Sequence, residues 1–120
     1  MTCPTNNFGN LSLAELREKH AYFSQRRRAL EDEHQSRATK KQQLEREKRG
    51  QIGKYSYRIL SDDTLGWSDK RRLKQEKKNV VAQFDSAIER EDAELWRLEN
   101  EMSLMMGHLL ELRWRIDRFW

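Results

Sequence analysis

The chain has 120 residues, of which 37% are charged and 36% apolar, and it contains a single proline. This length allows one small domain, and so many charged residues with so little proline are typical of long solvated helices. Four tryptophans, four phenylalanines and a regular apolar repeat argue against a disordered chain. The lone cysteine, Cys3, excludes an internal disulfide, so a disulfide-stapled secreted module is not expected.

The N-terminal region shows no targeting signal. Residues 1–10 lack the basic and apolar regions of a signal peptide, and no stretch of the chain is apolar for the roughly 18 residues that a membrane span needs. We therefore expect a cytoplasmic or otherwise intracellular, reducing location, or a component of a virion, and no contact with a membrane.

Charge is distributed unevenly along the chain. Residues 1–36 carry 5 basic and 5 acidic side chains, residues 37–78 carry 14 and 6, and residues 79–120 carry 5 and 9. The middle third is therefore strongly positive and the last third negative. This asymmetry is more informative about binding partners than the net charge of +4.

The first predicted helix has a well-marked beginning. Residues 1–12 are rich in turn-forming residues and are expected to form an irregular strap. Ser12 and Glu15 have the spacing of a capping box, and Leu11 and Leu16 that of a hydrophobic staple. The next residue that disfavours a helix is Gly50. The cap at Ser12 and this glycine together predict a helix over residues 13–49.

The segment 50–68 is expected to be an ordered connection with basic and aromatic residues. Its glycines and polar residues interrupt the helical pattern, and the alternation of Tyr55, Tyr57 and Ile59 with polar residues suggests a short extended piece. Ser68 or Asp69 can cap a second helix, predicted over residues 69–120. Gly107 interrupts this helix at a cost of about 1 kcal/mol, too little to end it.

The second helix carries a heptad pattern of the kind found in coiled coils. Eleven of twelve positions alternating at spacings of three and four are apolar, with Glu91 as the exception. The two rows are Val81, Ile88, Leu95, Met102, Leu109 and Ile116, and Phe84, Glu91, Leu98, Met105, Leu112 and Phe119.

A weaker stripe of the same period runs along the first helix. Its rows are Leu16, Phe23, Leu30, Arg37 and Leu44, and Leu13, His20, Arg27, His34 and Lys41. The fold class predicted is therefore all-α, an antiparallel two-helix coiled-coil hairpin that self-association or a partner could complete to a bundle. One register that aligns the two stripes sets Arg27 opposite Glu91, as an ion pair that would fix the register; in the alternative, both side chains extend into solvent.

In that register the apolar C-terminal end of the second helix has no partner in the first. An uncovered apolar face of this kind is a binding surface or an aggregation liability, and Met and Trp are common at interfaces. Three covers are possible: residues 1–12, a second copy of the chain, or another protein. The predicted partner-binding residues are Met105, Met106, Leu109, Leu110, Leu112, Trp114, Ile116, Phe119 and Trp120.

The connection is expected to form a basic tip. Phosphate backbones or an acidic protein could bind such a surface, and its aromatic residues could stack on unpaired bases, although basic runs on long helices are often only a solvated face. The candidate residues are Lys48, Arg49, Lys54, Arg58, Lys70, Arg71, Arg72, Lys74, Tyr55, Tyr57 and Trp67.

The sequence gives no sign of catalysis. The histidines are far apart along the predicted helices, no phosphate-binding loop or zinc spacing occurs, and a two-helix hairpin has no enclosed pocket. We expect a non-enzyme without cofactor or metal and without a small-molecule substrate. Its function would be protein–protein interaction, as a structural component, adaptor or inhibitor, through the C-terminal end of the second helix. The alternative is a nucleic-acid-associated accessory protein that uses the basic tip.

Overall fold

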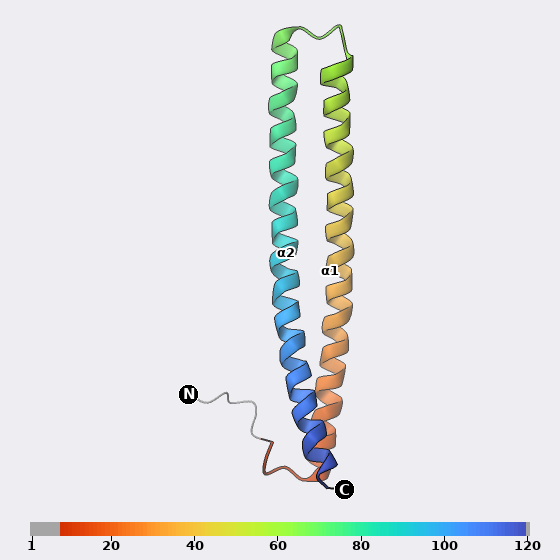
Figure 1. The fold of residues 1–120 in the computed structure, drawn as a ribbon, viewed down its shortest axis with the longest axis vertical. Coiled ribbons are helices and arrows are strands. Elements are labelled where there is room, and N and C mark those ends of the chain that lie inside the picture. Colours follow the sequence, from red (N-terminus) through yellow and green to blue (C-terminus); the bar gives the residue numbers. More distant parts are fainter. Residues whose placement is uncertain (1–7, 120) are drawn as a thin grey trace, which may run out of the picture. The chain divides into compact units, whose positions relative to one another are not determined.

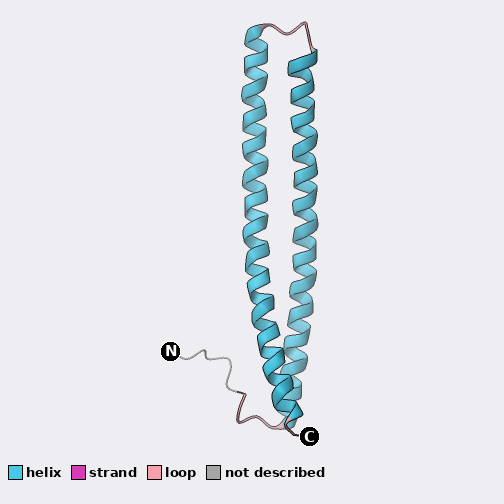
Figure 2. Cartoon of the chain, in the orientation of Figure 1, coloured by secondary structure: helices cyan, strands magenta, loops and turns pink. Residues whose placement is uncertain are grey.

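The computed structural model describes residues 8–119 and contains two α-helices, α1 (Leu13–Ser61) and α2 (Trp67–Asp117). Residues 62–66 join them, so that the helices run antiparallel (Figure 1). The described part of the chain contains helices and loops and no strand (Figure 2). The predicted fold class, an all-α helical hairpin, is confirmed.

The hairpin divides into two compact units. Of the described residues, unit 1 joins residues 8–35 to residues 96–119, and unit 2 is the continuous segment Ser36–Leu95. Each unit pairs a stretch of α1 with a stretch of α2.

The beginning of α1 is stabilised as its sequence predicts. The Glu15 amide donates a hydrogen bond to Ser12 Oγ (3.2 Å), and the Ser12 amide donates one to Glu15 Oε1 (3.3 Å). These reciprocal bonds satisfy two amides that would otherwise lack a partner at the helix start. Leu11 and Leu16 belong to the same apolar cluster, as expected of a staple.

The predicted end of the first helix at residue 49 is wrong, because α1 continues for twelve more residues to Ser61. Gly50 and Gly53 lie within it, and the segment around Tyr55 and Tyr57 is helical rather than extended. An isolated glycine costs a helix only about 1 kcal/mol, which burial of Ile59 on the extra turns offsets. The connection is therefore much shorter than the predicted segment 50–68.

The turn between the helices is closed by Asp62. Its Oδ1 accepts a hydrogen bond from the Thr64 amide (3.0 Å) and another from the Thr64 hydroxyl. These hydrogen bonds hold the pKa of the Asp62 carboxyl below its usual value.

The α2 helix begins at Trp67, two residues before its predicted start. The Lys70 amide donates a hydrogen bond to the Gly66 carbonyl (3.1 Å) at this helix start.

Both predicted stripes lie on the buried sides of their helices. Of the twelve heptad positions of α2, all but Phe119 are buried or half-buried, and so are all ten positions predicted on α1. Few side chains are fully enclosed, because a layer of two helices covers each stripe from one side only. Those with less than 2% exposure are Leu16, Leu30, Leu73, Leu98 and Leu112.

The predicted register, in contrast, is wrong by about two heptads. Glu91 pairs with Arg37 (3.3 Å) and Lys40 (3.2 Å), whereas Arg27 pairs with Glu31 on its own helix (3.1 Å). A heptad pattern aligns equally well after a slip of seven residues, so the stripes alone could not select the register. The longer α1 moves the turn and shifts every partner with it.

Glu91 is the one buried carboxylate in the described part of the seam, with 5% of its surface exposed. Burial raises the pKa of Glu91, but hydrogen bonds and charges from Lys40 and Arg37 outweigh this effect, so that the pKa lies below its usual value. Because both cations remain partly exposed, the carboxylate is neutralised without full burial of its partners.

The two glycines in the middle of α1 lead to the first prediction. A Cβ added at Gly50 or Gly53 would meet no atom within 4 Å. Gly50→Ala and Gly53→Ala should each raise the free energy of unfolding by about 1 kcal/mol, measured by urea denaturation. Gly66→Ala is the control: it stands just before α2, where alanine is a poor cap, and should give no gain. Equal gains at all three sites would contradict this account.

The register can be tested by double-mutant cycles. Glu91→Gln combined with Arg37→Gln should show a coupling energy of about 1 kcal/mol, because the side chains contact each other directly. The effects of Glu91→Gln and Arg27→Gln on the free energy of unfolding should add to within about 0.3 kcal/mol. Coupling to Arg27 instead would restore the register predicted from the sequence.

The lowered pKa of Glu91 makes its contribution to stability dependent on pH. The contribution is fully present above the usual glutamate pKa of about 4.3 and is lost as the pH falls through the lowered value. Glu91→Gln should therefore destabilise the hairpin at pH 7, and the difference from the wild type should shrink toward zero at about pH 2. Urea midpoints at both pH values measure this. A difference that stays constant would show that the charge of Glu91 is not involved.

Candidate protein-binding surfaces

The C-terminal end of α2 has a partner within unit 1, so the predicted uncovered seam is not observed. Phe8, Leu16 and Leu112 form a buried cluster, with Phe23 and Ile116 packed against it. The Phe23 ring stacks on buried His108 with centroids 4.8 Å apart, and Phe8 approaches His108 edge-on at 6.1 Å. The start of α1 and Phe8 of the N-terminal strap thus cover most of the seam that the predicted register left open.

The eight predicted partner-binding residues that the structure describes divide into three groups by burial. Leu109 and Leu112 are buried in the hairpin itself, and Met105, Met106 and Ile116 are half-buried. Trp120 lies outside the described residues. The exposed members are Leu110, Trp114 and Phe119.

A second apolar stripe, which the sequence interpretation missed, runs along the exposed side of α2 in unit 1. Trp96, Leu110 and Trp114 have 68%, 62% and 55% of their surface exposed. Two residues that are 18 positions apart are separated by five helical turns and lie on the same side of a helix. Trp96 and Trp114 therefore share one side of α2. The buried Leu98 and Leu112 lie on the opposite side. The exposed Ser103 and Gly107 fall on this side between them. We call Trp96, Ser103, Gly107, Leu110 and Trp114 the outer stripe.

Four of the five residues of the outer stripe have a spacing that is the same in both directions, and Leu110 is the exception. Trp96, Ser103, Gly107 and Trp114 are separated by seven, four and seven residues, large at the ends and small in the middle. A Cβ at Gly107 would meet no atom within 4 Å, so packing within the described chain does not require glycine there. The Arg118 guanidinium lies over the Trp114 ring, 4.5 Å from its centroid, at the end of the stripe.

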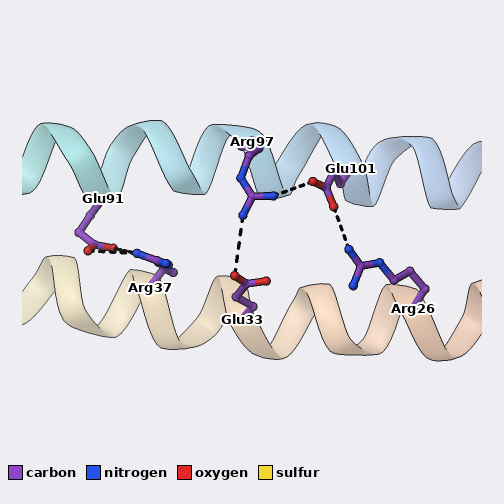
Figure 3. Close-up of polar contacts among 6 residues, drawn as sticks. All are labelled: Arg26, Glu33, Arg37, Glu91, Arg97 and Glu101. Atoms are coloured by element: carbon purple, nitrogen blue, oxygen red, sulfur yellow. Dashed lines mark hydrogen bonds and ion pairs between the residues drawn. The ribbon is translucent and has the colours of Figure 1, made fainter.

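Ion pairs hold the two helices of unit 1 together beside this stripe. Glu101 accepts from Arg97 on its own helix (2.6 Å) and pairs with Arg26 on α1 (3.3 Å) (Figure 3). Arg97 also reaches Glu33 (3.8 Å), and His34 Nε2 lies 3.1 Å from Glu99 Oε1. These contacts span α1 and α2 and leave the tryptophan side of α2 uncovered.

The basic residues predicted to form a tip all belong to unit 2, and two of them are paired with carboxylates there. Lys48 pairs with Asp85 (2.5 Å), and Arg72 lies near Asp69 (3.8 Å) and Glu76 (3.9 Å). Lys70 and Tyr55 are half-buried. The exposed members are Arg49, Lys54, Arg58, Arg71, Lys74, Tyr57 and Trp67. The Arg71 guanidinium lies 5.4 Å from the centre of the Trp67 ring.

Unit 2 also contains an apolar groove between the end of α1 and residues 74–85 of α2. Its volume is about 560 Å³, and Ile59, Leu60, Val81 and Ala82 contribute its apolar lining. Lys74, Lys77 and Lys78 line it as well, so that three basic residues share the groove with the aliphatic side chains. The sequence analysis missed this groove because it ended the first helix at residue 49, so that Leu60 was not expected to lie on a helix beside Val81.

Neither a metal site nor a membrane span is found in residues 8–119. These residues contain no group of three or more His, Cys, Asp or Glu side chains that could hold a metal ion. Neither helix, over its described length, is long and apolar enough to cross a membrane.

No protein family, curated protein or solved structure matches the chain.

Proposed function

We propose that the chain is a non-catalytic protein–protein interaction module that associates with a second copy of itself through the outer stripe. The observation that carries the proposal is the exposure of Trp96, Leu110 and Trp114 on one side of α2. Tryptophan is strongly enriched among residues that dominate binding energy, and exposed aromatic side chains in a row are costly to leave in water. An adaptor or structural subunit in a reducing, intracellular compartment fits this proposal.

A second copy is the favoured occupant because Trp96, Ser103, Gly107 and Trp114 are arranged symmetrically along α2. A two-fold interface uses the same patch on both subunits, so residue i meets residue j and j meets i. An antiparallel pair of α2 helices centred between Ser103 and Gly107 places Trp96 of one copy beside Trp114 of the other at both ends. The small residues in the middle let the two helices approach closely, and the result is a four-helix arrangement.

Two tryptophan substitutions test the proposal in the full chain. Trp96→Ser and Trp114→Ser should each raise the dimer dissociation constant by about 30-fold, as expected for a hot-spot residue, measured by sedimentation equilibrium. Tyr22→Ser is the matched control, because Tyr22 is 62% exposed but lies on α1 outside the stripe. It should change the constant by less than about 2-fold.

Gly107→Leu separates association from folding. Leucine favours the helix more than glycine does, and a Cβ at position 107 meets no atom within 4 Å in the monomer. The helix content and the urea midpoint of unfolding should therefore stay the same or increase. The added side chain blocks close approach of a second α2, and the variant should be monomeric. A wild-type chain that stays monomeric at high concentration would refute self-association through this stripe.

The alternative expectation, binding of nucleic acid through the basic tip, stays a prediction. It is the weaker candidate because Lys48 and Arg72 are paired with carboxylates of unit 2, which leaves fewer cations of the predicted tip for phosphate contacts. Phosphate contacts need free cations arranged along one surface.

A further inference from the structure

We propose that the lysine-bordered groove of unit 2 is a docking site for an acidic amphipathic helix of another protein. This site is separate from the outer stripe, and neither proposal depends on the other. Its occupant follows from three features of the groove: its apolar lining, its unpaired cations and its lack of aromatic side chains.

The apolar lining contains one strongly exposed side chain, Leu60, beside the buried Ile59 and the half-buried Val81. Leu60 has 80% of its surface exposed, the highest value among the large hydrophobic residues that the structure describes as exposed. It lies on the last turn of α1, beside Ile59, and α2 contributes Val81 and Ala82 to the same groove. A groove of about 560 Å³ is large enough for apolar side chains on one side of a helix, the arrangement used when an amphipathic helix binds in a groove.

The charge of the groove selects an acidic partner. Within the described chain, Lys74, Lys77 and Lys78 form no ion pair, whereas the one carboxylate of the lining, Asp85, is neutralised by Lys48. The border is therefore positive. Carboxylates on the flanks of a bound helix would pair with these ammonium groups while its apolar residues cover Leu60.

The lining also argues against nucleic acid as the occupant. Single-stranded nucleic acid binds through aromatic side chains on which bases stack, and the groove contains none. Tyr57 and Trp67, the exposed aromatics of unit 2, do not line it. An aliphatic surface between lysines suits leucine and glutamate side chains better than bases and phosphates.

Binding of a designed peptide to the full chain tests the proposal. The probe is a fluorescent amphipathic helix with leucine on one side and glutamate on the other, followed by anisotropy at low and physiological salt. The wild type should bind it, and should bind neither a version with lysine in place of glutamate nor one with serine in place of leucine. Failure to bind the acidic probe even at low salt would overturn the proposal.

Matched charge reversals locate the site. Lys74→Glu with Lys78→Glu should weaken binding by about 10-fold or more, as expected for a pair of charges bordering the interface. Lys54→Glu with Arg58→Glu is the control, because it changes the charge by the same amount at the same spacing, on the side of α1 opposite Ser56 of the groove. This variant should weaken binding of the peptide by less than about 3-fold. Equal losses in both variants would show general attraction to a basic protein and would refute a defined site.

Leu60→Ser tests the apolar part. Because this side chain is almost fully exposed, the substitution should leave helix content unchanged and weaken binding by about 10-fold. If the Lys74 and Lys78 reversal lost helix content, Lys74→Gln with Lys78→Gln would replace it. Unchanged affinity with Leu60→Ser, or tighter binding of a single-stranded RNA of equal length than of the acidic peptide, would reject the groove as a site for an acidic helix.

Discussion

Each unit of this chain is only two helices thick, and this constraint explains most of its features. A helix in a two-helix layer can bury only one stripe, because nothing covers the side turned away from its neighbour. The seam of α2 is therefore mostly half-buried, and only a handful of leucines are fully enclosed. Polar interactions across the helix pair must supply the specificity that such a thin core lacks.

Glu91 illustrates how this specificity arises. A leucine at this position would fit any register that differs by seven residues, whereas a buried carboxylate requires cations within reach. Arg37 and Lys40 meet this requirement, and Lys41 pairs with Asp92 beside them (2.6 Å). Charge matching thus removes the ambiguity that the repeating apolar pattern leaves.

The sequence predicted the local features of the hairpin well and its long-range features poorly. The Ser12–Glu15 cap and the buried sides of both helices follow from contacts between near neighbours, which a pattern of three and four residues records directly. The helix end was wrong because Gly50 disfavours a helix by only a small amount, which packing far along the chain outweighs. That one error moved the turn, displaced the register and left the C-terminal seam without a partner.

Some candidate surfaces were predicted from the sequence and others were missed, because a surface formed by two helices depends on their register. The apolar end of α2 was recognised, but Leu109 and Leu112 proved internal, and the exposed Trp96 was overlooked although its spacing from Trp114 was visible in the sequence. Leu60 could be recognised as part of a groove only once α1 was known to continue past Gly53. Surfaces formed by two helices depend on register, which is the least local property of a hairpin.

The division into two units also bears on how the chain folds. Unit 2 is one continuous segment around the turn at residues 62–66, so its first contacts close a short loop at little cost in entropy. Unit 1 joins two segments separated by all of unit 2, and the Phe8–Leu112 cluster closes a loop of nearly the whole chain. Pairing should therefore start at the turn and proceed outward, and the aromatic cluster around His108 should be the last part of the core to form.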